Sequence, residues 1–408
     1  MSARASDFGW QARQTDLPAG FLTSDIESLS MDAPVRKAAL LAETRLIGFG
    51  AATRVIASDV DLRWLGEFFE PSLGTEGLAV DQATVTASVD ANRFETLKRE
   101  FSLHERRLYD CFTLDGSFDA FSGCHTAQGE LLISLDRFDL MLRVGATKDV
   151  YELVAGSTNA KVRMGLMRVV REIATVRALR AGGVPLHGSA CARQGGAFGF
   201  LGHKTAGKTT SLIHWLQSEE TRFLANDRFF LFRRRGGWVI RGMPTIVKLR
   251  PDTLQLFDDL PRRATEYPFD WNRTLAEVHA AAGQVTPSPR AATFTQTQFL
   301  RIMDRSAVAE APLRMLLFPE RDDSLDVAVY QPLSPRDAVA RLEANLLSPG
   351  TLPATAEVFD PEPNREIALE PILGACREVA DSGCCFAYRQ GMRTLSRIAE
   401  PPAFSRVA

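Results

Sequence analysis

The sequence predicts an α/β protein in two parts, a smaller mixed α+β domain over residues 21–160 and a larger α/β domain over residues 161–408. The length of 408 residues is about twice what one domain of ~100–200 residues needs. Apolar residues alternate with a period of two in strand-like stretches of the first part, whereas from Lys161 they follow the 3.6-residue period of a helix. A strand, a glycine-containing loop and a helix then follow one another directly between residues 197 and 217. This order of elements is typical of an α/β domain.

The composition excludes several classes of protein. Hydrophobic residues make up 45% of the chain and charged residues 24%, close to the globular averages of roughly 45–50% and 25%. Disordered, collagen-like and coiled-coil proteins therefore do not fit. The formal net charge of -2 gives no global field that would attract nucleic acid or an anionic membrane. No run of residues approaches the ~18 consecutive apolar residues of a membrane helix, so we expect no nucleic-acid or membrane partner.

The six cysteines are scattered without a C-x-x-C pair, which argues against a disulfide scaffold and against a zinc site. Reduced thiols are expected, and they predict a cytoplasmic location. Cys384 and Cys385 are adjacent and would suit a redox pair, but two small residues on a C-terminal helix are the simpler interpretation.

The first part is expected to mix strands and helices behind a flexible tail at residues 1–20. The dipeptide Asp115-Gly116 predicts a hairpin over Tyr109–Phe121, because Asp-Gly favours the tight turn that joins two strands. The other expected elements are helices over Asp25–Thr44, Asp59–Phe69 and Ala91–Arg107, and strands over Arg45–Ser58, Ala83–Val89, Glu130–Val144 and Asp149–Val154.

The second part opens with a helix from Lys161 that ends at Gly182-Gly183, because glycine commonly follows the last helical residue. A solvated face is expected for its arginines, which lie largely off the apolar stripe: Arg163, Arg168, Arg171 and Arg180. The segment 262–298 is expected to form a long mobile loop. The remaining expected elements are hairpins over Leu186–Leu201 and around Arg233–Gly237, helices over Thr209–Gln217 and Pro335–Leu347, strands over Phe223–Ala225, Ile246–Leu249 and Leu313–Phe318, and a mostly helical C-terminus over Glu370–Glu400.

One loop carries a motif with a chemical meaning. Gly202-His203-Lys204-Thr205-Ala206-Gly207-Lys208-Thr209 matches G-x-x-x-x-G-K-[ST] at every fixed position, and Thr210 continues into the helix. The two glycines let the backbone curl around phosphates, so that successive N–H groups and the helix N-terminus point at the negative charge. Lys208 then reaches the β- and γ-phosphates, and the Thr209 hydroxyl is placed to ligate Mg²⁺. The alternative is a glycine-rich turn between a strand and a helix that binds nothing.

Two further residues are expected beside this loop. Asp227 lies just beyond the strand Phe223–Ala225, and strand tips are where open α/β sheets bind ligands. A carboxylate there can hold Mg²⁺ or accept a proton from an attacking hydroxyl, although an Asp that caps a turn is an alternative. His187 precedes Gly188 and Ser189 on the neighbouring strand and would orient Asp227 or be a core histidine. His203 and His214 are interpreted as non-catalytic.

Motifs that are missing narrow the class further. The sequence has no Asn-Lys-x-Asp for guanine recognition, no Leu-Ser-Gly-Gly of an ABC transporter ATPase, and no apolar strand that ends in Asp-Glu as in helicases and AAA-type motors. A small kinase built around a phosphate-binding loop remains.

Over residues 182–249 the chain resembles the HPr kinase/phosphorylase superfamily, and is most similar to the HPr-kinase-like proteins, which include the lasso-peptide kinases. The resemblance rests on a His-Gly strand at His187, the Gly202–Thr209 loop, and the stretch Leu224-Ala225-Asn226-Asp227. It implies an HPr-kinase-like P-loop core that uses ATP and Mg²⁺. Lys208 would bind the phosphates, Thr209 and Asp227 would hold the metal, and His187 and Asp227 would be active-site residues.

The sequence departs from the family at two positions. Asn226 replaces the first acid of an acidic pair, and Val239 replaces the glutamate in a stretch similar to Glu-Ile-Arg-Gly. Losing two carboxylates puts the reverse phosphorylase reaction in doubt, because Asn226 can orient a hydroxyl but cannot take its proton. Several arginines follow Asp227 in the sequence. One of them would stabilise the transferring phosphoryl group, or the arginines would form a solvated turn: Arg228, Arg233, Arg234, Arg235 and Arg241.

The sequence therefore predicts a kinase that transfers the γ-phosphoryl group of ATP to a hydroxyl, and the resemblance implies a serine of a small protein or peptide. The alternatives are a small-metabolite kinase and a nucleotide-gated interaction module with little transfer. Residues 21–160 and 262–298 are the candidate acceptor-binding surfaces. Members of the family often form homo-oligomers, but no feature of the sequence fixes a number of subunits.

Overall fold

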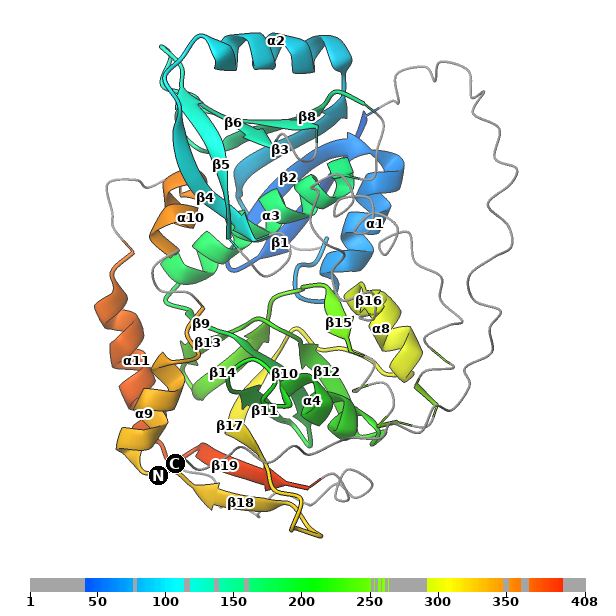
Figure 1. Ribbon diagram of the computed structural model, residues 1–408, viewed down its shortest axis with the longest axis vertical. Coiled ribbons are helices and arrows are strands. Elements are labelled where there is room, and N and C mark those ends of the chain that lie inside the picture. The colour runs from blue at the N-terminus through cyan, green and yellow to red at the C-terminus, as the bar shows by residue number, and fades with distance from the viewer. Residues whose placement is uncertain are drawn as a thin grey trace, which may run out of the picture. The chain divides into compact units, whose positions relative to one another are not determined.

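The computed structural model describes most of the chain from Leu41 onward (Figure 1). The described residues are 41–75, 79–113, 118–135, 139–157, 161–250, 253, 256–257, 259–260, 263, 292–347, 352–360 and 367–391. The tail expected at residues 1–20 and most of the helix expected from Asp25 lie outside them. That helix was predicted to reach Thr44, but Leu41–Thr44 belong to a strand. Residues from Leu40 onward form one compact unit by their contacts.

The chain is a mixed α/β protein with two large mixed sheets. Eight strands make the first sheet, in the order β1-β2-β3-β8-β7-β6-β5-β4, with parallel pairing on both sides of β3. They are β1 (Leu41–Gly48), β2 (Ala51–Ser58), β3 (Asp81–Val89), β4 (Arg107–Thr113), β5 (Phe118–His125), β6 (Leu131–Leu135), β7 (Leu140–Val144) and β8 (Val150–Ala155). The hairpin predicted at Asp115-Gly116 is confirmed by the pairing of β4 with β5.

The segment predicted as one strand over Arg45–Ser58 is a hairpin instead. Phe49 and Gly50 take positive φ angles of 53° and 82°, which reverse the chain so that β1 pairs with β2. Glycine adopts such angles without steric cost. The alternating pattern on both sides of the turn hid it from sequence reasoning.

Three helices pack on this sheet. Helix α1 (Asp59–Phe69) and α2 (Ala91–Ser102) begin at Ser58 and Asp90, whose side chains accept a hydrogen bond from the backbone of the first turn. Helix α2 ends earlier than the predicted Arg107, which belongs to β4. It covers one face, where its Phe94 and Leu97 pack on Leu132. Helix α3 (Lys161–Arg180) packs on β3, β7 and β8 from the other face.

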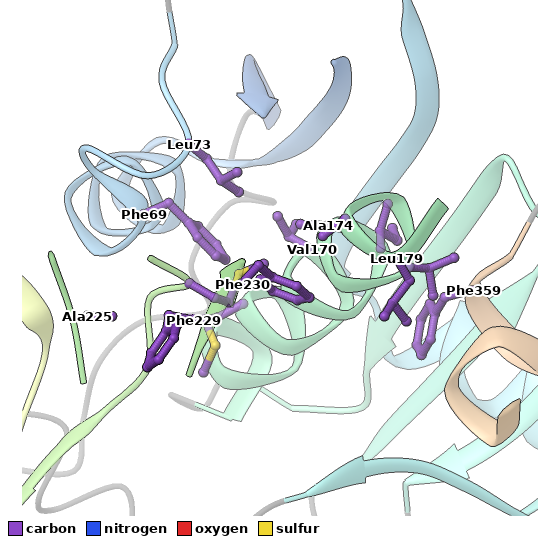
Figure 2. Packing of buried hydrophobic residues seen from close by; sticks show 14 of the residues in the cluster. Phe69, Leu73, Val170, Ala174, Leu179, Ala225, Phe229, Phe230 and Phe359 are labelled. Carbon is purple, nitrogen blue, oxygen red and sulfur yellow. The ribbon is translucent and has the colours of Figure 1, made fainter. Parts of the chain in front are cut away.

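Helix α3 is buried on nearly all sides, which corrects the prediction of a solvated arginine face. Arg168 is 6% exposed and Arg171 is 5% exposed. The physical reason is that α3 lies in a core that also contains residues of the second sheet. Figure 2 shows Val170 and Ala174 of α3 beside Phe230 of that sheet. A helix enclosed in this way buries its polar side as well as its apolar stripe.

Nine strands make the second sheet, in the order β12-β10-β11-β17-β14-β13-β9, with β19 paired to both β17 and β18. They are β9 (Val184–Leu186), β10 (Gly188–Arg193), β11 (Gly196–Leu201), β12 (Thr221–Ala225), β13 (Phe229–Arg234), β14 (Gly237–Gly242), β17 (Glu310–Arg321), β18 (Val329–Pro332) and β19 (Cys385–Gln390). The predicted hairpins β10–β11 and β13–β14 are confirmed by their antiparallel pairing. Helix α4 (Lys208–Leu216) packs on one face through Leu212 and Trp215, which meet Phe198 and Phe200 of β11.

The C-terminal part differs from the mostly helical prediction. Helices α9 (Pro335–Glu343), α10 (Leu352–Phe359) and α11 (Leu369–Asp381) are present, but the chain then enters β19. Cys384 therefore lies in the connection after α11 and Cys385 lies on a strand, not on a helix. The strand forms because β17 extends over twelve residues and offers a parallel partner to Cys385–Gln390. A local pattern cannot reveal such a partner.

The segment 262–298, predicted as a mobile loop, lies largely outside the described residues. Its described end is ordered, with β16 (Ala292–Phe294) paired to β15 (Val247–Leu249) and helix α8 (Gln296–Met303) beginning at a Thr295 capping box. The side chains of Gln296 and Thr297 donate to the carbonyl oxygens of Glu70 and Glu67 at 2.9 Å and 2.5 Å. These residues of α8 therefore contact the end of α1.

Candidate functional site

Strand directions bring the predicted site residues to one edge of the second sheet. Strand β10 pairs antiparallel with both β11 and β12, so β11 and β12 run the same way and end at the same edge. The Gly202–Thr209 loop follows β11, and Asn226-Asp227 follow β12. His187 precedes β10, which starts at that edge. The predicted place of Asp227, at a strand tip beside the loop, is confirmed.

The loop has the backbone conformation that its two fixed glycines predict. Gly202 has a φ of 154° and Gly207 a φ of 91°, both unfavourable for other residues. A Cβ atom on Gly202 would lie 2.8 Å from the Cβ atom of Ala206. Gly207 is also the N-cap of α4, without a side-chain hydrogen bond. The first N–H groups of α4 lack intrahelical partners by position, so this end of the helix suits an anion.

Lys208 lies inside the loop and is held there by its backbone. Its Nζ donates to the carbonyl oxygen of Gly202 at 2.6 Å and to that of His203 at 3.1 Å. Burial lowers the pKa of Lys208, and the Asp227 carboxylate partly opposes that shift. The Lys208 ammonium group therefore lies against the loop backbone, and the Asp227 carboxylate attracts it electrostatically.

His187 and Asp227 form a pair at the sheet edge. His187 Nδ1 lies 3.4 Å from Asp227 Oδ1, and both side chains keep roughly two-fifths of their surface exposed (41% and 46%). Burial lowers the pKa of His187, Asp227 opposes the shift, and Lys208 and Arg228 add to it. A lowered pKa favours the neutral imidazole near pH 7. The pair can therefore orient a carboxylate toward a solvent-accessible reactant.

Asp227 itself holds an unusual backbone conformation. Its φ is 73°, in the left-handed region that residues other than glycine seldom adopt. Its carbonyl oxygen accepts from the Gly188 N–H at 3.2 Å, and Thr245 Oγ1 donates to the preceding carbonyl of Asn226 at 2.6 Å. Strained backbone of this kind persists only where the surroundings fix it, and it concentrates at functional sites.

Asn226 uses its amide oxygen to organise two hydroxyl groups. Ser189 Oγ donates to Asn226 Oδ1 at 3.1 Å and Thr209 Oγ1 donates at 3.2 Å. Asn226 is 6% exposed. The Asn226 side chain therefore fixes the orientation of the candidate metal ligand Thr209. Val239 is a buried core residue of β14.

The cluster of arginines after Asp227 does not converge on the site. Arg228 adjoins Asp227, and its Nη1 lies 3.6 Å from Glu172 Oε1 on α3. Arg234 pairs with Glu310, and Arg241 donates to the Ser72 carbonyl oxygen. The others, Arg233 and Arg235, are exposed along the β13–β14 hairpin. Arg228 therefore faces Glu172, and its charge also helps to lower the pKa of His187.

A buried charge network lies behind Arg228 and was missed by sequence reasoning. Arg171 donates to Glu172 Oε1 through Nε at 3.1 Å and Nη2 at 2.8 Å. Burial alone would raise the pKa of Glu172, but Arg171 and Arg228 hold it below its ordinary value. A charged α3 residue thus supports the segment that carries Asp227. The periodicity of α3 suggested solvent exposure, so no signal in the sequence pointed to this network.

Asn345, after α9, is a second residue that sequence reasoning missed. Its Oδ1 accepts from the Gly202 N–H at 2.8 Å, and its backbone oxygen accepts from the His187 N–H at 2.8 Å. It is 143 positions from Gly202 in the sequence. No local motif marks it.

No protein-family model matches the chain, and no curated protein matches it. Within the described part, no group of three or more His, Cys, Asp or Glu side chains gathers as a metal cluster. In the same part of the chain, every helix is too short or too polar to cross a membrane. Five cysteines whose side chains the structure describes are free: Cys124, Cys191, Cys376, Cys384 and Cys385.

Proposed function

We propose that the chain is a cytoplasmic P-loop kinase that transfers the γ-phosphoryl group of ATP to a hydroxyl, with Mg²⁺ as cofactor and a serine of a small protein or peptide as acceptor. The observation that carries the proposal is the meeting of the Gly202–Thr209 loop with the His187–Asp227 pair at one sheet edge. A loop of this conformation suits phosphates, and an exposed carboxylate beside it suits an acceptor hydroxyl.

Each residue has a defined task in this proposal. Lys208 and the N–H groups at the start of α4 bind the β- and γ-phosphates and offset their charge. Asp227 accepts the proton of the acceptor hydroxyl. The oxygen of that hydroxyl bonds to the γ-phosphorus, and the bond between the γ-phosphorus and the β-phosphate oxygen breaks. His187 orients Asp227 through its Nδ1. The acceptor class rests on the resemblance to HPr-kinase-like proteins.

The site offers one or two protein oxygen ligands for Mg²⁺. Thr209 would hold it through its hydroxyl oxygen, already oriented by Asn226, and Asp227 would hold it through a carboxylate oxygen if it does not serve as the base. One or two protein ligands are usual for Mg²⁺, which takes its other ligands from phosphates and water. Bound Mg²⁺ would supply charge neutralisation between the phosphates.

A nucleotide-gated interaction module is the second candidate, because Asn226 and Val239 leave the site with fewer carboxylates than the family pattern. In that case nucleotide would bind without transfer. Asn226 accepts from two hydroxyl groups, and Val239 is buried in the core.

The test is transfer from γ-labelled ATP with Mg²⁺ into lysate separated into small-molecule, peptide and protein fractions. Lys208→Met and Asp227→Asn are the inactive controls. Label in the peptide or protein fraction that both controls abolish supports the proposal. Label confined to small molecules indicates a metabolite kinase. Tight ATP binding without label in any fraction indicates the interaction module.

A further inference from the structure

The segment after α9 contacts two parts of the candidate site. Asn345 is 7% exposed, and its side chain lies between the start of the Gly202–Thr209 loop and the end of α9. Oδ1 accepts from the Gly202 N–H at 2.8 Å, while Nδ2 donates to the Arg341 carbonyl oxygen at 2.7 Å. The backbone oxygen of Asn345 accepts from the His187 N–H at 2.8 Å. One residue therefore contacts the loop and the residue that pairs with Asp227.

The chemistry of these contacts requires an amide. One end of the side chain accepts a hydrogen bond and the other end donates one, and a carboxamide provides both at once. Alanine would provide neither, and an aspartate would lose the donor to Arg341. Because the side chain is buried, each unpaired partner would lose its hydrogen bond without full compensation from water.

The backbone around Asn345 is fixed to the sheet. Leu346 forms an antiparallel bridge with Leu186 of β9, and the Leu347 N–H donates to the Pro185 carbonyl oxygen at 3.0 Å. Leu342 and Leu346 also belong to the main hydrophobic core. Asn345 is therefore held by the sheet and the core, and its side chain offers Gly202 a fixed hydrogen-bond acceptor.

We infer that Asn345 is a positioning residue that fixes the start of the Gly202–Thr209 loop relative to His187, and that the loop's affinity for nucleotide depends on it; this rests on the proposed function. Gly202 has no side chain to restrict its backbone, so its backbone can adopt many conformations. In this structure its φ is 154°. The Asn345 hydrogen bond selects one of them. Preorganisation of this kind raises affinity because less ordering remains for the ligand to impose.

The test compares Asn345→Ala with Ser334→Ala as a matched control. Ser334 caps the other end of α9, where its Oγ accepts from the Asp337 N–H at 3.2 Å and donates to Asp337 Oδ2 at 2.7 Å. Removing the cap weakens the same helix without touching Gly202. ATP is the probe in calorimetric binding with Mg²⁺, and hydrogen exchange of the peptide containing Gly202 is measured alongside thermal unfolding.

Asn345→Ala should weaken ATP binding about 5- to 10-fold, as expected for loss of one buried hydrogen bond, and should speed exchange at Gly202. Ser334→Ala should lower thermal stability yet leave both the affinity and the exchange unchanged. Asn345→Asp keeps an acceptor and should retain the slow exchange at Gly202.

Wild-type affinity in Asn345→Ala, or an equal loss of affinity in Ser334→Ala, would overturn the inference. The two failures remain separable. If the wild-type protein binds no ATP, the proposed function fails, and the exchange data still decide whether Asn345 fixes the loop. Equal exchange at Gly202 in wild type and Asn345→Ala would show that it does not.

Discussion

Replacing Glu172 by glutamine should destabilise the protein more than any change at an exposed ion pair. Glu172 is 4% exposed and accepts two hydrogen bonds from Arg171 on a single oxygen. Arg228 lies 3.6 Å from the same oxygen. Glutamine keeps the shape of the side chain and one acceptor oxygen, but it carries no negative charge. In the contacts described above, Glu172 is the carboxylate that the Arg171 and Arg228 guanidinium groups share. Arg171 then remains buried and charged.

The expected cost follows from that burial. Removing one partner of a buried ion pair costs about 3–5 kcal/mol, and the acceptor that glutamine retains places this variant near 3 kcal/mol. Neutralising Arg171 as well, in Arg171→Met/Glu172→Met, should recover part of the loss because an apolar pair carries no uncompensated charge. Burial lowers the pKa of Arg171 and Arg228 adds to that effect, whereas Glu172 and Asp227 oppose it.

The assay is urea unfolding followed by tryptophan fluorescence and far-UV circular dichroism. Glu370→Gln is the matched control, because Glu370 pairs with Arg377 at the surface with side-chain exposures of 73% and 52%. Exposed pairs contribute little, so the unfolding midpoint of that control should stay at the wild-type value. A Glu172→Gln midpoint equal to that of the control would refute the assignment of Glu172 as the anchor of this network.

Three further predictions concern the loop, the metal and pH. Lys208→Met should weaken ATP binding at least about 10-fold, whereas the exposed Lys204→Met should bind nearly as wild type; equal losses in calorimetry would contradict the distinct role of Lys208. Asn226→Asp should lower the Mg²⁺ concentration for half-maximal transfer about 10-fold, because it adds a carboxylate beside the candidate metal ligands, and an unchanged Mg²⁺ titration would argue against a metal there. Burial would raise the pKa of Glu152, but hydrogen bonds from Arg93 hold it below the ordinary 4.5. Its stabilisation is therefore present above pH 4.5 and is lost as the pH falls through the folded-state pKa, so thermal unfolding of Glu152→Gln should depend less steeply on acid pH than the wild type does.

The sequence alone predicted what depends on neighbours in the chain. The Gly202–Thr209 loop, the helix after it and the hairpin before it follow from glycine geometry and short-range periodicity. Asp227 could be placed at a strand tip because one helix and one strand account for its distance from Lys208. Its approach to His187 depends on the antiparallel pairing of β10 with β12, and the sequence left His187 open between orienting Asp227 and being a core histidine.

Tertiary structure alone decided what depends on distant segments. Asn345 reaches Gly202 across 143 positions, and Glu172 reaches Arg228 because α3 lies in a core shared with the second sheet. Strand β19 exists because β17 offers a partner edge, although the local pattern favoured a helix. In each case the contact forms between segments whose separation along the chain carries no periodic signal. Side-chain burial and strand pairing are set by the completed fold, and only there do an amide and a carboxylate acquire their partners.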